Sequence, residues 1–203
     1  MRQDTPRSPS PRTVALLVGF FLVAIAAGIG AGVWLNSREA SAPAGAAVGG
    51  PFRLTAHDGR TVTEADFMGM PVLLFFGFTH CPDICPTTLA DVSEVLERLG
   101  PDAEKVQALF VSIDPERDTP QVLASYIGAF HPRILGLSGD EATTAEIVRA
   151  YRVYAKKVPL KDGGYTMDHT AVVYLLDKEG RFVAPFDLRR PAEAAAAELR
   201  RYF

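Results

Sequence analysis

The 203-residue chain has only two cysteines, Cys81 and Cys85, and no run of basic residues. A disulfide between these two cysteines would close a very short loop, which constrains an unfolded chain little, so the fold cannot depend on disulfide staples. Once four charged residues near the N-terminus (Arg2, Asp4, Arg7 and Arg12) are set aside, 18 basic and 23 acidic residues remain. This mild acidity argues against a nucleic-acid-binding protein.

One long stretch also lacks charge. Residues Thr13–Leu35 contain no Asp, Glu, Lys or Arg, and as a helix they would extend roughly 35 Å, enough to cross a bilayer core of about 30 Å. A cleaved signal peptide is the alternative, but its apolar region is usually only about 7–15 residues long. The small-residue site Ala40–Ala42 is also followed by Pro43, which disfavours cleavage. We therefore expect a transmembrane anchor at residues 13–35.

The charges before this stretch predict its orientation. Three arginines against one aspartate in residues 1–12 keep that segment in the cytoplasm by the positive-inside rule. We therefore expect a single-pass protein of the inner (cytoplasmic) membrane with its soluble domain in the periplasm. Residues 36–50 are small and polar and predict a flexible linker. Residues 51–203 have the length of one domain.

Strand-like and helix-like segments alternate in this domain. Strands are expected at 52–56, 61–63, 71–78, 106–114, 134–137, 170–177 and 181–187. Helices are expected at 86–100, 120–130, 141–156 and 191–202. The order predicts an α/β fold with a mixed central sheet flanked by helices. Ligands of such folds gather where a strand ends and the next helix begins, and residues 78–86 form such a junction.

The two cysteines lie in this junction, in the sequence FTHCPDICP (Phe78–Pro86). Pro82 disfavours helix at Cys81, whereas Pro86 suits a first helical turn, so we expect Cys81 in the loop and Cys85 near the helix start. A helix N-terminus favours thiolate, which both attacks disulfides and ligates soft metals such as Cu(I). A structural disulfide is the alternative interpretation, but such a short loop gives it little stabilising value.

A metal site needs at least one more ligand, and the chain has four histidines, His57, His80, His131 and His169. For the first three we expect packing or surface roles. His169 immediately precedes a predicted buried strand, at an edge that can approach the cysteines. Its neighbour Asp168 could orient the imidazole, and Met167 is a reserve soft ligand. A lone histidine is nevertheless more often structural, so the residues alone leave the ligand set open.

Three motifs together resemble the Sco/SenC family: CPDICP (residues 81–86), VSIDPERDTP (111–120) and YTMDHT (165–170). The resemblance covers about residues 51–203 and implies a thioredoxin-like fold. It also implies one copper ion per domain, Cu(I) or Cu(II), held by Cys81, Cys85 and His169, with Asp168 in support. The roles of the signature residues Asp114 and Asp118 stay open.

The resemblance further implies delivery of copper to the binuclear copper A centre in subunit II of cytochrome c oxidase. Another periplasmic copper carrier is a further expected partner. The main alternative is a membrane-anchored thiol-disulfide oxidoreductase that keeps the acceptor's cysteines reduced, using Cys81 and Cys85 as its redox pair. A structural assembly factor ranks lower. A thiol peroxidase ranks lowest, because Phe78 replaces the threonine expected three residues before a peroxidatic cysteine.

Overall fold

The computed structural model describes residues 48–161 and 163–203. The predicted cytoplasmic segment, the anchor at 13–35 and most of the linker at 36–50 lie outside these residues. Within the described ranges, no helix combines the length and apolar character that a membrane span requires. At the start of this part, Val48 packs against the core and the Gly49 N–H donates to the Ala150 carbonyl oxygen (2.9 Å). The packed chain thus extends slightly before Pro51.

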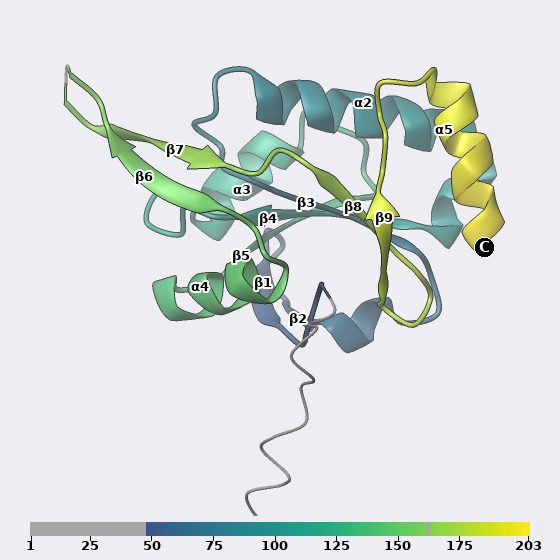
Figure 1. The fold of residues 1–203 in the computed structure, drawn as a ribbon, viewed down its shortest axis with the longest axis horizontal. Coiled ribbons are helices and arrows are strands. Elements are labelled where there is room, and N and C mark those ends of the chain that lie inside the picture. The colour runs from purple at the N-terminus through teal and green to yellow at the C-terminus, as the bar shows by residue number, and fades with distance from the viewer. Residues whose placement is uncertain (1–47, 162) are drawn as a thin grey trace, which may run out of the picture. The chain divides into compact units, whose positions relative to one another are not determined.

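Seven strands form the central sheet, in the order β2-β1-β5-β4-β3-β8-β9 (Figure 1). Their bounds are β1 Arg53–Ala56, β2 Thr61–Thr63, β3 Val72–Gly77, β4 Gln107–Ser112, β5 Ile134–Ser138, β8 Val173–Leu176 and β9 Phe182–Pro185. Strands β3, β4 and β5 are parallel, and the outer pairings are antiparallel. The predicted mixed central sheet is confirmed.

Helices cover the sheet on both faces. In Figure 1, α2 (Ile84–Leu99), α3 (Pro120–Ile127) and α5 (Ala192–Leu199) lie on one side of it and α4 (Glu141–Ala150) on the other. Three short 3-10 helices complete the pattern, at Glu64–Phe67, Gly100–Lys105 and Arg200–Tyr202. The apolar residues at three- and four-residue spacing in α2 are all buried, among them Leu89, Val92 and Leu96.

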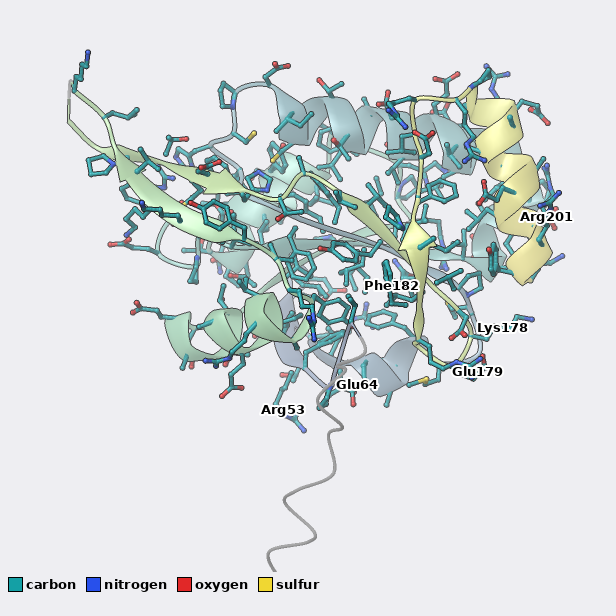
Figure 2. All side chains as sticks on the ribbon, in the orientation of Figure 1. Arg53, Glu64, Lys178, Glu179, Phe182 and Arg201 are labelled. Atoms are coloured by element: carbon teal, nitrogen blue, oxygen red, sulfur yellow. The ribbon has the colours of Figure 1, made fainter. Side chains whose placement is uncertain are left out.

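Strand β3 lies at the centre of the core. All six of its residues are buried, because β4 and β8 flank it and helices cover it. Charged side chains such as those of Arg53, Glu179 and Arg201 point outward in Figure 2, whereas Asp114 and Asp118 are buried. The carboxyl end of β3 leads directly into the cysteine loop, so a fully buried strand carries the predicted site.

One predicted helix is too long. The expected helix at 141–156 ends at Ala150, and Ala155–Pro159 is instead strand β6. The chain reverses at Arg152, whose φ of 54° is the one positive value of a non-glycine residue in the described ranges. Strand β6 pairs antiparallel with β7 (Tyr165–His169) in a separate two-stranded sheet. His169 therefore ends a strand of its own and does not directly precede β8, which begins at Val173.

Candidate metal centre

The cysteines occupy the turn between β3 and α2. Cys81 lies in the loop, and Cys85 is the second residue of α2, as predicted. Their residue exposures are 8% and 0%, and both are free thiols. The Cys85 backbone N–H donates to the Cys81 sulfur (3.3 Å), so the first turn of the helix holds that sulfur in place. The loop thereby presents two sulfur atoms at one end of a buried strand.

His169 reaches this loop from the end of β7. Its Nε2 atom lies 3.6 Å from the Cys85 sulfur, while its Nδ1 atom lies 3.0 Å from the Thr170 carbonyl oxygen. A carbonyl can only accept, so we assign the proton to Nδ1, which leaves the Nε2 lone pair directed at the cysteines. One ligand atom each from Cys81, Cys85 and His169 lie within 4.8 Å of one another. Three residues from two distant segments thus form one cluster.

Aromatic rings restrict the imidazole. The Phe78 ring meets it edge-to-face, with centroids 5.7 Å apart and planes at 86°. Phe75 of β3 approaches it at 6.3 Å and 60°. Such apolar neighbours limit rotation of the ring and lower the local dielectric constant around the cluster.

The two neighbours of His169 that the sequence suggested lie elsewhere. Side chains alternate along a strand, so Asp168 faces away from the side that carries His169, and it is exposed. The Thr170 carbonyl, which sequence reasoning did not consider, is the group that accepts from the imidazole. Met167 lines a separate groove of about 670 Å³, together with Asp114, Glu116 and other residues.

The environment of Cys85 differs from the expectation drawn from the helix terminus. Burial raises the pKa of this thiol far above its ordinary value, and the Phe78 backbone N–H offsets the effect only in part. Desolvation of this buried sulfur is the largest influence on its pKa. Without metal, Cys85 is a neutral thiol, and a metal that binds there must displace its proton.

The other three histidines are engaged elsewhere. In the described part of the chain, His169 is the only histidine in the metal-type cluster. His57 and His131 each accept a backbone N–H at Nδ1, from Gly136 (3.0 Å) and Arg133 (3.1 Å). His80 is exposed beside the cysteine loop, with its Nδ1 atom 3.9 Å from the buried Asp118 carboxylate. None of them competes for the ligand role.

Sequence reasoning missed a glycine that the site requires. A Cβ atom on Gly77, the last residue of β3, would stand 2.8 Å from the Cys85 sulfur and 2.7 Å from the Phe110 ring. Real Cβ atoms essentially never come so close, so only glycine lets the sulfur lie against the end of the strand. The signal was available, because a glycine inside an apolar strand often marks a close approach of another group.

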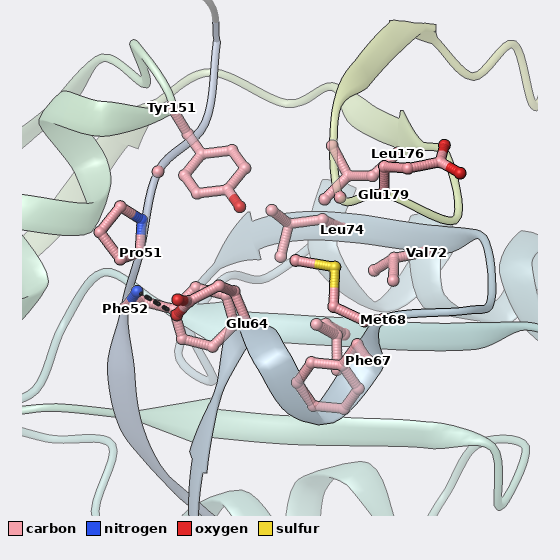
Figure 3. A pocket seen from close by; sticks show the side chains of 13 residues that line it. Pro51, Phe52, Glu64, Phe67, Met68, Val72, Leu74, Tyr151, Leu176 and Glu179 are labelled. Carbon is pink, nitrogen blue, oxygen red and sulfur yellow. Dashed lines mark hydrogen bonds between the residues drawn. The ribbon is translucent and has the colours of Figure 1, made fainter. Parts of the chain in front are cut away.

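A second cavity lies away from the cysteines. It measures about 270 Å³ and is lined mainly by apolar side chains, including Phe52, Phe67, Met68 and Tyr151 (Figure 3). The dashed line in Figure 3 marks a hydrogen bond from the Phe52 N–H to Glu64 (2.8 Å). This cavity is lined by no cysteine or histidine and is separate from the Cys-Cys-His cluster.

Comparisons with known proteins agree with this geometry. Residues 40–203 match the SCO1/SenC family model. The chain is 41% identical to the mitochondrial SCO2 homologue of Bos taurus, over 99% of this chain and 79% of that protein. The copper-bound structure of Bradyrhizobium japonicum ScoI is 58% identical and superposes with a TM-score of 0.76, over 77% of this chain and all of that one.

The copper-bound ScoI of Arabidopsis thaliana is more distant. It is 39% identical with a TM-score of 0.70, again over 77% of this chain and all of the other. These superpositions cover the described domain, and they establish its fold as the mixed α/β, thioredoxin-like fold that the resemblance implied.

Proposed function

Because this chain belongs to the SCO1/SenC family, we propose that it is a copper carrier that takes part in assembling the copper A centre of cytochrome c oxidase. Its cargo is one copper ion per domain, bound by Cys81, Cys85 and His169. The observation that carries the proposal is the approach of the three ligand atoms to within 4.8 Å of one another.

The donor set fits copper. Thiolate sulfur is a soft ligand that selects Cu(I), and imidazole nitrogen also suits Cu(II). Two thiolates and one imidazole can therefore hold either oxidation state. A structural zinc site would close its tetrahedron with a fourth protein ligand, and the cluster in the described residues has three.

The chain's own groups prepare the site for loading. The Thr170 carbonyl keeps the Nδ1 proton of His169, so the Nε2 lone pair is ready without rearrangement. The Cys85 thiol gives up its proton on loading, since its raised pKa keeps it protonated beforehand. A three-ligand site leaves a coordination position for a ligand of the acceptor during transfer, which suits a carrier.

The proposal places the domain in the periplasm, tethered by residues 13–35 to the inner membrane, with subunit II of the oxidase as the acceptor. A tether confines the carrier near a membrane-bound partner and raises its effective concentration there. A second periplasmic copper carrier is the proposed source of the metal. In this proposal Asp168 supports the site only indirectly, because it lies in the strand that carries His169.

Copper titration of the purified domain tests the carrier proposal. We expect one copper per domain, loss of Cu(I) and Cu(II) binding in Cys81→Ser and Cys85→Ser, and selective weakening of Cu(II) binding in His169→Ala. The selectivity follows because two thiolates can hold Cu(I) almost linearly, whereas Cu(II) needs the imidazole. Undiminished Cu(II) charge-transfer absorption in His169→Ala would refute the three-ligand site.

A thiol-disulfide oxidoreductase acting on the acceptor is the second proposal, favoured by the closeness of the Cys81 and Cys85 sulfurs. His169→Ala separates the two functions, because disulfide exchange needs the thiols but not the imidazole. In cells that lack the native protein, a carrier with this substitution should fail to support oxidase activity at low copper and recover partly as copper is added. Wild-type activity at limiting copper would favour the oxidoreductase.

A further inference from the structure

The hairpin that carries His169 has little support from the core. None of the residues of β6 or β7 is buried, and the two strands pair only with each other. Of the hairpin's apolar side chains, only those of Ala155 and Met167 pack against the core, and both remain partly exposed; the other core contact is that of the His169 ring with Phe75 and Phe78. Hydrophobic packing therefore does not by itself fix the distance between His169 and the cysteines.

Arg117 provides a specific attachment for the hairpin. Its Nη1 atom donates to the Tyr165 carbonyl oxygen (2.9 Å), and its guanidinium carbon lies 3.8 Å from the Tyr165 ring centroid. Its Nε atom donates to the buried Asp114 carboxylate (2.5 Å), which also accepts from the Tyr165 hydroxyl (2.8 Å). Asp114, Arg117 and Tyr165 thus form a closed ring of contacts at the start of β7.

The same guanidinium also lies near the aromatic wall of the metal centre. Its carbon is 5.8 Å from the Phe78 ring centroid, and Phe78 meets the His169 imidazole edge-to-face. The Nη2 atom of Arg117 is buried and has no hydrogen-bond partner in the described part of the chain. An unsatisfied buried donor destabilises a fold, so stability alone does not explain this placement.

Residues 114–118 form one loop after β4, and Asp118 at its other end contacts the cysteine loop. Asp118 is fully buried and accepts three hydrogen bonds: from Thr79 N–H (3.0 Å), Thr79 Oγ1 (2.7 Å) and Ser112 Oγ (2.7 Å). Thr79 stands two residues before Cys81. The carboxylate therefore ties the cysteine loop to the end of β4, and residues 114–118 connect both halves of the site.

We propose that residues 114–118 form a frame that sets the separation between His169 and the cysteine sulfurs. In this frame Arg117 positions the histidine strand and Asp118 positions the cysteine loop. Neither residue belongs to the Cys-Cys-His cluster itself. The inference rests on the proposed copper site and gives the signature residues Asp114 and Asp118, whose roles the sequence leaves open, a structural purpose.

The two halves of the frame predict different copper phenotypes. Arg117→Met frees the strand that carries His169, so Cu(II) affinity should fall by about 10- to 100-fold, the usual cost of losing a group that orients a ligand. The affinity for Cu(I), which the two thiolates hold, should fall by less than about threefold, well below that range. Thr79→Val removes a hydrogen bond that holds the cysteine loop and should weaken both oxidation states together.

The measurements are competition titrations with Cu(I) and Cu(II), the Cu(II) thiolate charge-transfer spectrum, and amide hydrogen exchange across 155–169 without metal. Arg117→Met should accelerate exchange in the hairpin, and Arg117→Lys, which keeps a cation and a donor, should restore part of the Cu(II) affinity. Arg181→Met is the matched control. Arg181 pairs with Asp177 (2.8 Å) in the turn beyond β8, at the opposite end of β3 from the cysteines, and its loss should leave copper binding unchanged.

The outcomes separate this inference from the function on which it rests. A wild-type domain that binds no copper overturns the carrier proposal. A wild-type domain that binds copper, together with an Arg117→Met variant of wild-type Cu(II) affinity and spectrum, overturns the frame. If Arg117→Met does not fold, Tyr165→Phe replaces it, because it removes only the hydroxyl that is bonded to Asp114 and Glu116 of the frame. Unchanged Cu(II) binding in that variant also overturns the frame.

Discussion

A Cβ atom on Gly77 would stand 2.8 Å from the Cys85 sulfur, so strand β3 and helix α2 meet with no room for a methyl group between them. The sulfur that binds metal in the proposed function is also a packing atom of the core. The sulfur lies against Gly77 of β3 on one side, and the His169 imidazole lies 3.6 Å from it.

Gly77→Ala should therefore damage both stability and metal binding. The added methyl group overpacks the core, which typically costs about 1–3 kcal/mol, and it pushes the Cys85 sulfur out of place. Gly139→Ala is the matched control, because its Cβ would stand 2.9 Å from Leu54 in a region without cysteine. We expect urea unfolding to show destabilisation of both variants, and copper titration to show weaker binding only in Gly77→Ala. Equal copper binding in the two variants would contradict this explanation.

The two thiols should differ in reactivity without metal. Thiolate is the species that reacts with iodoacetamide, and burial raises the pKa of Cys85, which has no exposed surface. We expect Cys81 to be alkylated first in the folded domain at pH 8, as mass spectrometry of Cys81→Ser and Cys85→Ser can measure. In urea the difference should disappear. Faster alkylation of Cys85 in the folded domain would show that its burial does not control its reactivity.

His131 should make stability depend on pH. Burial lowers the pKa of its imidazole below the ordinary 6.5, with a further contribution from Arg133, although Glu97 and Glu104 act in the opposite direction. The folded state therefore favours the neutral ring, and the unfolded state binds more protons as the pH falls through 6.5. Stability should accordingly decrease from pH 7.5 to pH 5.5.

His131→Asn tests this, because the amide oxygen can still accept the Arg133 N–H but does not titrate. Urea unfolding at the two pH values should show a smaller loss of stability in the variant than in the wild-type domain. The same loss in both proteins would mean that other groups cause the pH dependence.

The sequence was most informative where local chemistry decides the structure. Proline positions and an apolar strand placed Cys81 in the loop and Cys85 at the helix start, and the structure agrees. The β6–β7 hairpin was missed because its residues are half-exposed and mixed in character, although Gly163 and Gly164, both at positive φ, mark the turn between the two strands. The neutral state of Cys85 was also missed, since burial depends on tertiary packing and not on the helix terminus alone.

The structure brings His169 close to the two cysteines, as the sequence predicts, but its ring is held by a different group from the predicted Asp168. A neighbouring carboxylate is visible in a sequence, whereas a backbone carbonyl is present at every position and carries no signal. The hydrogen bond to the Thr170 oxygen could therefore be found only from coordinates. The same holds for Asp118, whose partner Thr79 is remote in the chain.

Control of the imidazole by a main-chain oxygen has a consequence for sequence change. No point substitution deletes a carbonyl group, so the acceptor at position 170 survives replacement of the threonine side chain as long as the backbone keeps its path. The Thr170 hydroxyl helps to keep that path by accepting the Tyr154 N–H (3.0 Å). Mutational drift around this histidine should therefore alter how firmly the ring is held before it alters which nitrogen faces the sulfurs.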